Sequence, residues 1–230
     1  MNRSCFIGFV ALFTLPLSAQ SQWELGLDLT GGFARGELAD NIDDGIGGGL
    51  RFAWKPRPTA RWSAGIDLRL INYDENSLFD PYEDCCRFID EIETQSNILM
   101  GHLFLKWERP RGFLRPHFEL LSGVKHFETE TRILGGEFED VIEDFTEFDD
   151  TAFSYGCGFG VSLALKDGPH GGDRGVGILL RFTGRLLYGT EATYVVEDSI
   201  VFEDPQTISF EIADSETNLF TIDAGITFRF

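Results

Sequence analysis

The sequence has no segment that could cross a membrane as a helix, and it is poor in basic residues. Beyond the first 21 of its 230 residues, no stretch holds the roughly 20 unbroken apolar residues that a transmembrane helix needs. Its 19 Lys and Arg are outnumbered by 38 Asp and Glu, which gives a net charge of −19 at pH 7. An acidic surface repels phosphates, so we expect no nucleic-acid partner. A membrane protein built from this chain must be a β-barrel, in which every backbone amide pairs with a neighbouring strand.

Residues 1–21 predict a secretory signal peptide. Arg3 supplies a positive charge, residues 5–15 form an apolar core, and residues 17–21 form a cleavage zone of small residues. The apolar core is too short to span a bilayer, and Cys5 lies inside it rather than after it, which argues against a lipoprotein. Residues 22–230 suit one domain.

The last twelve residues, 219–230, show the pattern on which the fold prediction depends. Apolar side chains alternate strictly with small or charged ones, as in a strand with one face in lipid and the other in a polar interior. The pattern recurs about eight times, in residues 23–34, 49–55, 62–73, 97–108, 113–127, 152–166, 176–188 and 219–230. We therefore predict an all-β protein, an eight-stranded antiparallel transmembrane β-barrel with an up-and-down meander order.

The connections between these strands alternate in length, which predicts the orientation of the barrel. Residues 56–61, 109–112 and 167–175 form short connections, typical of periplasmic turns, and residues 35–45, 74–95, 128–150 and 189–218 form long outer loops. The loop 128–150 holds ten Asp or Glu against one Arg. Two β-prone runs in the last loop, 193–196 and 207–212, could extend the final hairpin beyond the membrane.

Aromatic residues mark the two expected membrane surfaces. All four Trp fall at periplasmic strand ends and predict an interfacial girdle there, made of Trp23, Trp54, Trp62 and Trp107. We expect Tyr73, Tyr188 and Phe220 in the opposite girdle.

The polar faces of the strands predict a charged barrel interior. The residues placed there are Glu24, Asp28, Arg51, Asp67, Arg69, Lys106, Glu119, Lys125, Arg181, Arg185, Asp223 and Arg229. An eight-stranded barrel is only wide enough to be filled by its own side chains, and an unpaired buried charge costs several kcal/mol. We therefore favour a salt-bridged filling over a narrow gated pore.

Other candidate sites are weaker. The acidic loop 128–150 could bind divalent cations through carboxylate oxygens, but its spacing matches no defined cation loop, and solvated carboxylates are the favoured interpretation. Three states are open for the adjacent pair Cys85 and Cys86 in an exported loop: a strained disulfide, free thiols or a link to another molecule. A lipid-modifying enzyme would need a nucleophile and a base at the outer rim, where His126 has no evident hydroxyl partner in the sequence.

Three short motifs resemble those of small outer-membrane β-barrels of the OmpA, OmpX and opacity-protein kind, often labelled porin-like. They are Ile-Thr-Phe-Arg-Phe at 226–230, Arg-Pro-His-Phe-Glu at 115–119 and Gly-Cys-Gly-Phe-Gly at 156–160. The resemblance implies eight antiparallel strands and recognition of the end carrying Phe228 and Phe230 by the barrel-assembly machinery. Members of that group range from structural proteins to adhesins, and the acidic loops depart from its usual pattern.

Taken together, these features predict a monomeric protein in the outer membrane of a Gram-negative-type bacterium, with membrane lipid around it and no cofactor. The expected role is structural or surface-interacting, with a partner or divalent cations at the acidic loops, and not enzymatic. A small porin is the alternative, and an outer-membrane lipid-modifying enzyme is the third possibility.

Overall fold

The computed structural model describes residues 21–79, 91–135, 140–166, 175–196, 199, 201–204, 207–209 and 211–230. For residues 76–79, 91–93, 131–135, 140–147, 201–204 and 207–209 only the backbone is described. The elements are, in order, β1 (Gln22–Ala34), the 3₁₀ turn η1 (Gly36–Asp40), β2 (Gly45–Lys55), β3 (Trp62–Phe79), β4 (Glu91–Glu108), β5 (Leu114–Gly135), β6 (Asp140–Lys166), β7 (Gly177–Gly189), β8 (Glu191–Val195), β9 (Val201–Asp204), β10 (Thr207–Ser209), β11 (Ile212–Glu216) and β12 (Leu219–Arg229). None of the described residues form a helix with the length and apolarity needed to cross a bilayer.

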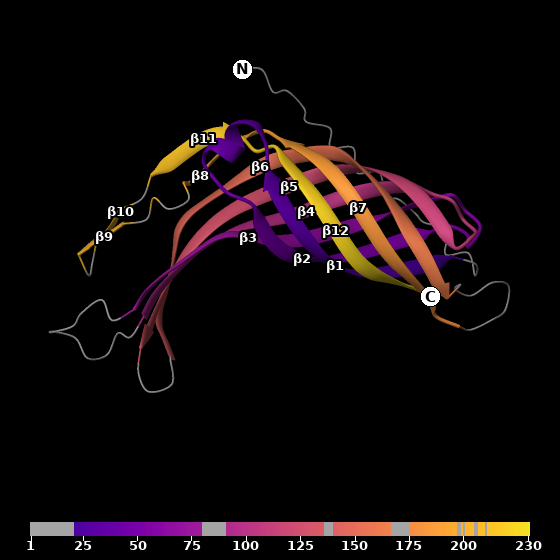
Figure 1. The fold of residues 1–230 in the computed structure, drawn as a ribbon, viewed down its shortest axis with the longest axis horizontal. Coiled ribbons are helices and arrows are strands. Elements are labelled where there is room, and N and C mark those ends of the chain that lie inside the picture. Colours follow the sequence, from indigo (N-terminus) through magenta and orange to yellow (C-terminus); the bar gives the residue numbers. More distant parts are fainter. Residues whose placement is uncertain are drawn as a thin grey trace, which may run out of the picture.

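Eight of the strands close into an antiparallel barrel (Figure 1), in the order β1-β12-β7-β6-β5-β4-β3-β2. Each of these strands pairs with the next barrel strand along the chain, β7 with β12 across the four short strands between them. β1 closes the barrel by pairing with β12 from Glu24↔Arg229 to Ala34↔Leu219. The predicted eight-stranded meander is confirmed.

The alternation of the sequence becomes the two surfaces of the barrel wall. Leu27, Leu29 and Phe159 are 51%, 71% and 66% exposed on the outside, where an outer-membrane barrel carries its apolar belt. The glycines on the inner face let neighbouring strands come close: a Cβ on Gly225 would lie 2.2 Å from the backbone oxygen of Leu27. The barrel wall therefore separates an apolar outer surface from a tightly filled interior.

Aromatic side chains form a girdle at each end of the belt. At the end with the short turns, Trp23 is paired with Trp54 and Trp62 with Trp107 across neighbouring strands. At the other end, Tyr155 stacks with Tyr188 at a ring distance of 5.9 Å. The placement of Tyr73 in this outer girdle was wrong, since Tyr73 is only 5% exposed and lies inside the barrel.

Strands β3 to β6 continue well past the outer girdle, and Figure 1 shows them curving away together at the end opposite the C-terminus. We call residues 74–79, 91–96, 128–135 and 140–150 the sheet extension. The prediction of loops at 74–95 and 128–150 was therefore wrong for most of these residues. They pair as strands, with register shifts, as far as Phe79↔Glu91 and Gly135↔Asp140.

The last long connection also contains paired strands. β8 pairs with β11 and continues the β7–β12 hairpin beyond the barrel, and β9 pairs with β10. The first β-prone run thus overlaps β8, while the second covers β10 and the first residue of β11.

Candidate functional site

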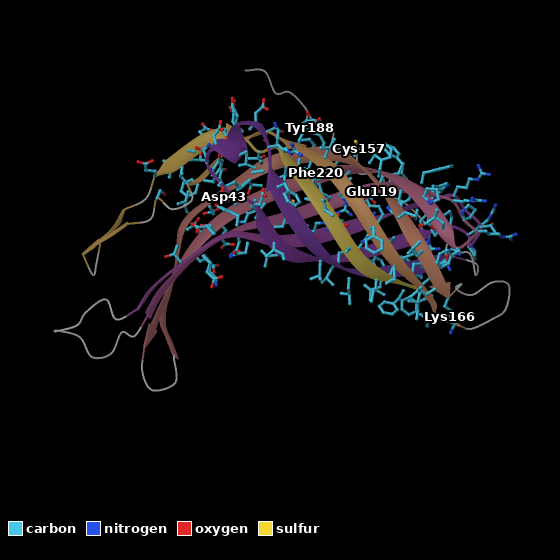
Figure 2. All side chains as sticks on the ribbon, viewed as in Figure 1. Asp43, Glu119, Cys157, Lys166, Tyr188 and Phe220 are labelled. Carbon is cyan, nitrogen blue, oxygen red and sulfur yellow. The ribbon has the colours of Figure 1, made fainter. Side chains whose placement is uncertain are left out.

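The centre of the barrel holds a neutral cluster of buried ion pairs, which we call the central cluster. It contains four arginines and four carboxylates, so that its formal charges sum to zero (4 − 4 = 0): Arg51, Arg69, Arg181, Arg185, Asp28, Asp67, Glu119 and Asp223. None of them is more than 6% exposed. Glu119, labelled in Figure 2, lies within the barrel.

Arg185 pairs with three carboxylates of the central cluster. Its guanidinium lies 2.5 Å from Glu119, 2.9 Å from Asp223 and 3.3 Å from Asp67. These three carboxylates come from β5, β12 and β3, so a single side chain on β7 links four strands across the interior. Charge-assisted contacts of this kind are strong and directional, and they hold the interior in one arrangement.

The other three arginines complete the central cluster. Arg69 contacts Asp67 at 2.6 Å and also pairs with Asp223, while Arg181 pairs with Asp28. Arg51 lies 2.5 Å from Glu119. The Arg51 guanidinium also lies 3.5 Å from the centre of the Phe104 ring, a cation–π contact.

A second group, the periplasmic cluster, lies near the end with the short turns. Lys106 is 2.9 Å from Glu24, and Arg229 is 2.8 Å from Glu24 and 2.5 Å from Glu108. Lys55 is 3.7 Å from Glu108. Lys55 and Glu108 were absent from the predicted interior set, although their places at the inward positions of β2 and β4 were already set by the alternation.

The opposite end of the barrel is closed by apolar residues instead of ion pairs. We call this group the apolar plug; its members are Leu38, Ile42, Ile71, Ile98, Phe127, Leu187, Tyr194 and Leu219. Leu38 of η1 is fully buried, and Phe127 stacks on Tyr194 at a ring distance of 5.4 Å. The Tyr194 hydroxyl is 2.7 Å from the Ser215 hydroxyl and accepts a hydrogen bond of 3.0 Å from the Asn41 amide, which joins the first outer connection to β8 and β11.

Lys125 lies between the central cluster and the apolar plug. It is 1% exposed, and its ammonium donates to the backbone oxygens of Leu187, at 3.3 Å, and Thr217. Among the described side chains no carboxylate pairs with it. The structure thus places all twelve predicted residues inside the barrel, eight in the central cluster, three in the periplasmic cluster and Lys125 alone.

The sheet extension carries a large negative charge. It contains twelve Asp or Glu and one basic residue, Arg132, which gives a net charge of −11 (12 − 1 = 11). Glu128 is registered opposite Asp149. The pKa of Glu128 is raised, first by partial burial and then by the neighbouring carboxylate of Glu130. The pKa of Asp150 is lowered because its carboxylate accepts hydrogen bonds from the backbone amides of Thr193, at 2.8 Å, and Thr151, at 2.7 Å.

His126 has a hydroxyl partner that the sequence did not reveal. It is registered opposite Thr151 on β6, and its Nδ1 lies 2.9 Å from the Thr151 hydroxyl near the outer girdle. The expectation that no hydroxyl is available to His126 was wrong, because the partner lies 25 residues away and only the strand register brings it close. His102 and His117 are buried and bonded to the hydroxyls of Ser154 and Thr183.

The remaining candidates divide between described and undescribed residues. Phe230 is exposed on the outer surface, and its backbone exchanges two hydrogen bonds with Trp23. Residues 1–20, with most of the predicted signal peptide, and the pair Cys85 and Cys86 lie outside the described residues. In the part that is described, no group of three His, Cys, Asp or Glu has an arrangement that could hold a metal ion.

No protein-family model and no curated protein matches the chain. Among solved structures, the chain is similar to Neisserial surface protein A, with a TM-score of 0.45, 10% identity, and 90% of this chain and 95% of that chain covered. It is similar to Ail, the attachment invasion locus protein of Yersinia pestis, with a TM-score of 0.45, 10% identity, and coverage of 92% and 99%. It is also similar to a major outer membrane protein from Thermus thermophilus, with a TM-score of 0.44, 13% identity, and coverage of 90% and 99%.

At these TM-scores the similarities assign no role to this chain, and its own geometry defines its class. A closed antiparallel barrel with an even number of strands, an apolar outer belt and aromatic girdles at both ends is the structure of bacterial outer-membrane proteins. The protein is a small eight-stranded β-barrel of a Gram-negative-type outer membrane.

Proposed function

We propose that the protein is a non-conducting barrel that anchors the sheet extension at the cell surface, where the extension binds a basic partner. The observation that carries the proposal is the filling of the interior: the central cluster and the apolar plug occupy successive levels of the barrel. A barrel filled in this way supports a structural or surface-interaction role and leaves the exterior as its binding surface.

Conductance in planar bilayers tests the filled interior. We expect the refolded protein to give no stable stepwise current. A reproducible single-channel conductance that disappears when the protein is omitted would favour the alternative, a small porin, over the proposal.

The sheet extension supports a surface-interaction role through its charge and its edges. Its net charge of −11 favours a cationic partner. β2 ends its pairing with β3 at Ile46↔Asn72, and β7 ends its pairing with β6 at Gly189↔Ser154. Among the described strands, both edges of the extension therefore lack a full neighbour, and such edges can accept an added strand.

Removal of the β5–β6 tip tests this surface. Thr129 is registered opposite Phe148, so residues 130–147 can be replaced by an Asn-Gly turn without moving the rest of the pair. We expect a fluorescent peptide of alternating Lys and Thr to bind the intact protein in nanodiscs and to bind the shortened variant much more weakly at low salt. A matched variant that keeps the hairpin but carries Glu130→Gln and Glu147→Gln should bind with intermediate strength. Equal binding to all three proteins would contradict the proposal.

The contact between His126 and Thr151 favours one second candidate, a lipid-modifying enzyme at the outer rim. A histidine bonded to a hydroxyl is the minimum arrangement for nucleophilic catalysis. A change in lipid A mass that depends on both His126 and Thr151 would establish this activity, and an unchanged lipid A mass in cells expressing the protein would exclude it.

A further inference from the structure

The end of the barrel with the short turns carries a shallow basic hollow outside the barrel lumen. It has a volume of about 380 Å³, and its lining is formed by Arg61, Trp107, Arg109, Pro110, Arg111 and Pro116. We call it the turn hollow. Figure 2 shows nitrogen-tipped side chains gathered at this end of the molecule, which also carries the labelled Lys166.

Backbone contacts bring two separate turns together to build the turn hollow. The Glu108 amide donates to the Arg61 backbone oxygen at 2.7 Å, which places the end of the β2–β3 turn against the end of β4. Gly112 has a φ of 107°, in the region that favours glycine. The buried Arg115 side chain donates to the Gly112 backbone oxygen at 2.9 Å and so holds the β4–β5 turn in place.

The arginines of the turn hollow differ from those in the barrel interior. Arg61, Arg109 and Arg111 are exposed, and within the described part of the chain no carboxylate pairs with any of them. The described turns 56–61 and 109–112 contain no Asp or Glu at all. In a chain of net charge −19, these three guanidinium groups form a separate positive site.

The position of Trp107 shows where this site lies relative to the membrane. Trp107 is 50% exposed and is registered opposite Trp62 of the periplasmic girdle. Tryptophan rings of such girdles lie at the level of the lipid headgroups. The three arginines are therefore at the depth where phosphate groups of the periplasmic leaflet lie.

We propose that the turn hollow binds the phosphodiester headgroup of an anionic phospholipid in the periplasmic leaflet. The planar guanidinium group presents paired donors that match phosphate oxygens, and three of them around one hollow complement a headgroup of net negative charge. Trp107 and the two prolines form the apolar side of the hollow, next to the start of the acyl chains. A zwitterionic phospholipid brings its own ammonium group toward the arginines and binds less well.

Native mass spectrometry of the full protein released from detergent tests this site with phosphatidylglycerol and phosphatidylethanolamine of identical acyl chains. We expect phosphatidylglycerol to be retained in preference, and its affinity to fall about tenfold in a variant with Arg61→Ala, Arg109→Ala and Arg111→Ala, as the loss of several exposed ion pairs implies. Arg111→Ala alone and Arg57→Ala form the matched pair, because each removes one exposed positive charge but Arg57, on the β2–β3 turn, does not line the turn hollow. The heat-dependent shift in electrophoretic mobility checks that each variant is folded.

Three results would overturn the proposal. The first is equal retention of the two lipids by the intact protein. The second is an equal loss of affinity in Arg111→Ala and Arg57→Ala, which would mean that the lipid responds to the total charge of this end and not to the turn hollow. The third is competition by glycerophosphoglycerol, the headgroup without acyl chains, at the same concentration as the lipid, which would indicate a soluble phosphodiester as the ligand.

Discussion

Replacement of Arg185 is the sharpest test of the filled interior. Arg185→Met keeps the aliphatic stem and removes the guanidinium, so that the central cluster changes from a formal charge of zero to −1. Glu119, Asp67 and Asp223 each lose one ion pair, but each keeps another arginine, Arg51 or Arg69. Removal of one partner from a buried ion pair costs about 3–5 kcal/mol. Because the three carboxylates keep second partners, we expect a loss near the lower end, about 3 kcal/mol in the free energy of unfolding.

Urea unfolding and refolding in lipid vesicles, followed by tryptophan fluorescence, measures this loss. A second substitution, Glu119→Gln, restores neutrality by leaving three arginines with three carboxylates. We expect the double variant to regain part of the lost free energy, and the coupling between the two sites to appear as non-additivity in a double-mutant cycle. Arg51→Ala and Arg181→Ala should act in the same direction, lowering thermal stability more than they change ion flux.

A loss below about 1 kcal/mol for Arg185→Met would refute this reasoning, because it is the value expected of a solvent-exposed ion pair. The interior would then be wet, and Arg185 would be screened by water. An Arg185→Met variant that is as stable as the parent and conducts ions would support a hydrated pore instead.

Three further predictions concern the barrel wall, the apolar plug and the sheet extension. Gly225→Ala should prevent folding or strongly reduce its yield, whereas Gly31→Ala, where the nearest atom to a new Cβ would be at 3.5 Å, should fold normally in the same mobility assay. Leu38→Ala should lower the free energy of unfolding by about 2 kcal/mol, the low end for a buried leucine, without producing a channel in planar bilayers, because the central cluster stays intact. Asp150 has a lowered pKa in the folded protein, so its bond to the Thr193 amide should still be present at the ordinary aspartate pKa, near 3.9, and should weaken only as the pH falls below that value. Hydrogen exchange of the Thr193 amide against pH measures this, and Asp150→Ala should abolish the protection at every pH.

The alternation of the sequence was sufficient to predict the barrel and the inward face of each strand. Since side chains on a strand alternate between its two faces, one lipid-facing residue determines the side on which all the others lie. Tyr73 shows the strength of this rule: counted from Trp62 it falls on the inward face, and it was misplaced only because the girdle rule was applied to it instead.

The sheet extension could not be recognised in the same way. A strand is detected in a sequence when one face is apolar, and beyond the membrane both faces of β5 and β6 can meet water. Residues 128–131 read Glu-Thr-Glu-Thr and therefore carry no apolar face, although β5 continues through them. The pairing of one long strand with the next keeps these residues in the sheet, and that pairing is not local in sequence.

The apolar plug was missed for a different reason. Leu38 and Ile42 are isolated apolar residues in a polar connection, and nothing in the local sequence shows that they are buried. They are buried in one apolar cluster with Tyr194, which is more than 150 residues away and is joined to the first connection through Asn41. The contact between His126 and Thr151 could not be predicted from the local sequence either, because it depends on the register of β5 and β6.

The distribution of charge along the barrel axis follows from the distance of each level from bulk water. The central cluster is buried on all sides and sums to zero, as expected where an unpaired charge costs several kcal/mol. The periplasmic cluster holds three cations and two carboxylates, an excess of one positive charge. Its members are also buried, at 1–3% exposure, but they lie at the strand ends, close to the periplasmic surface. The sheet extension stands clear of the membrane and carries −11. The loss in the free energy of unfolding on neutralising one charge should therefore fall in that order, from Arg185 to Arg229 to Glu130. Equal losses at the three levels would contradict this account of the interior.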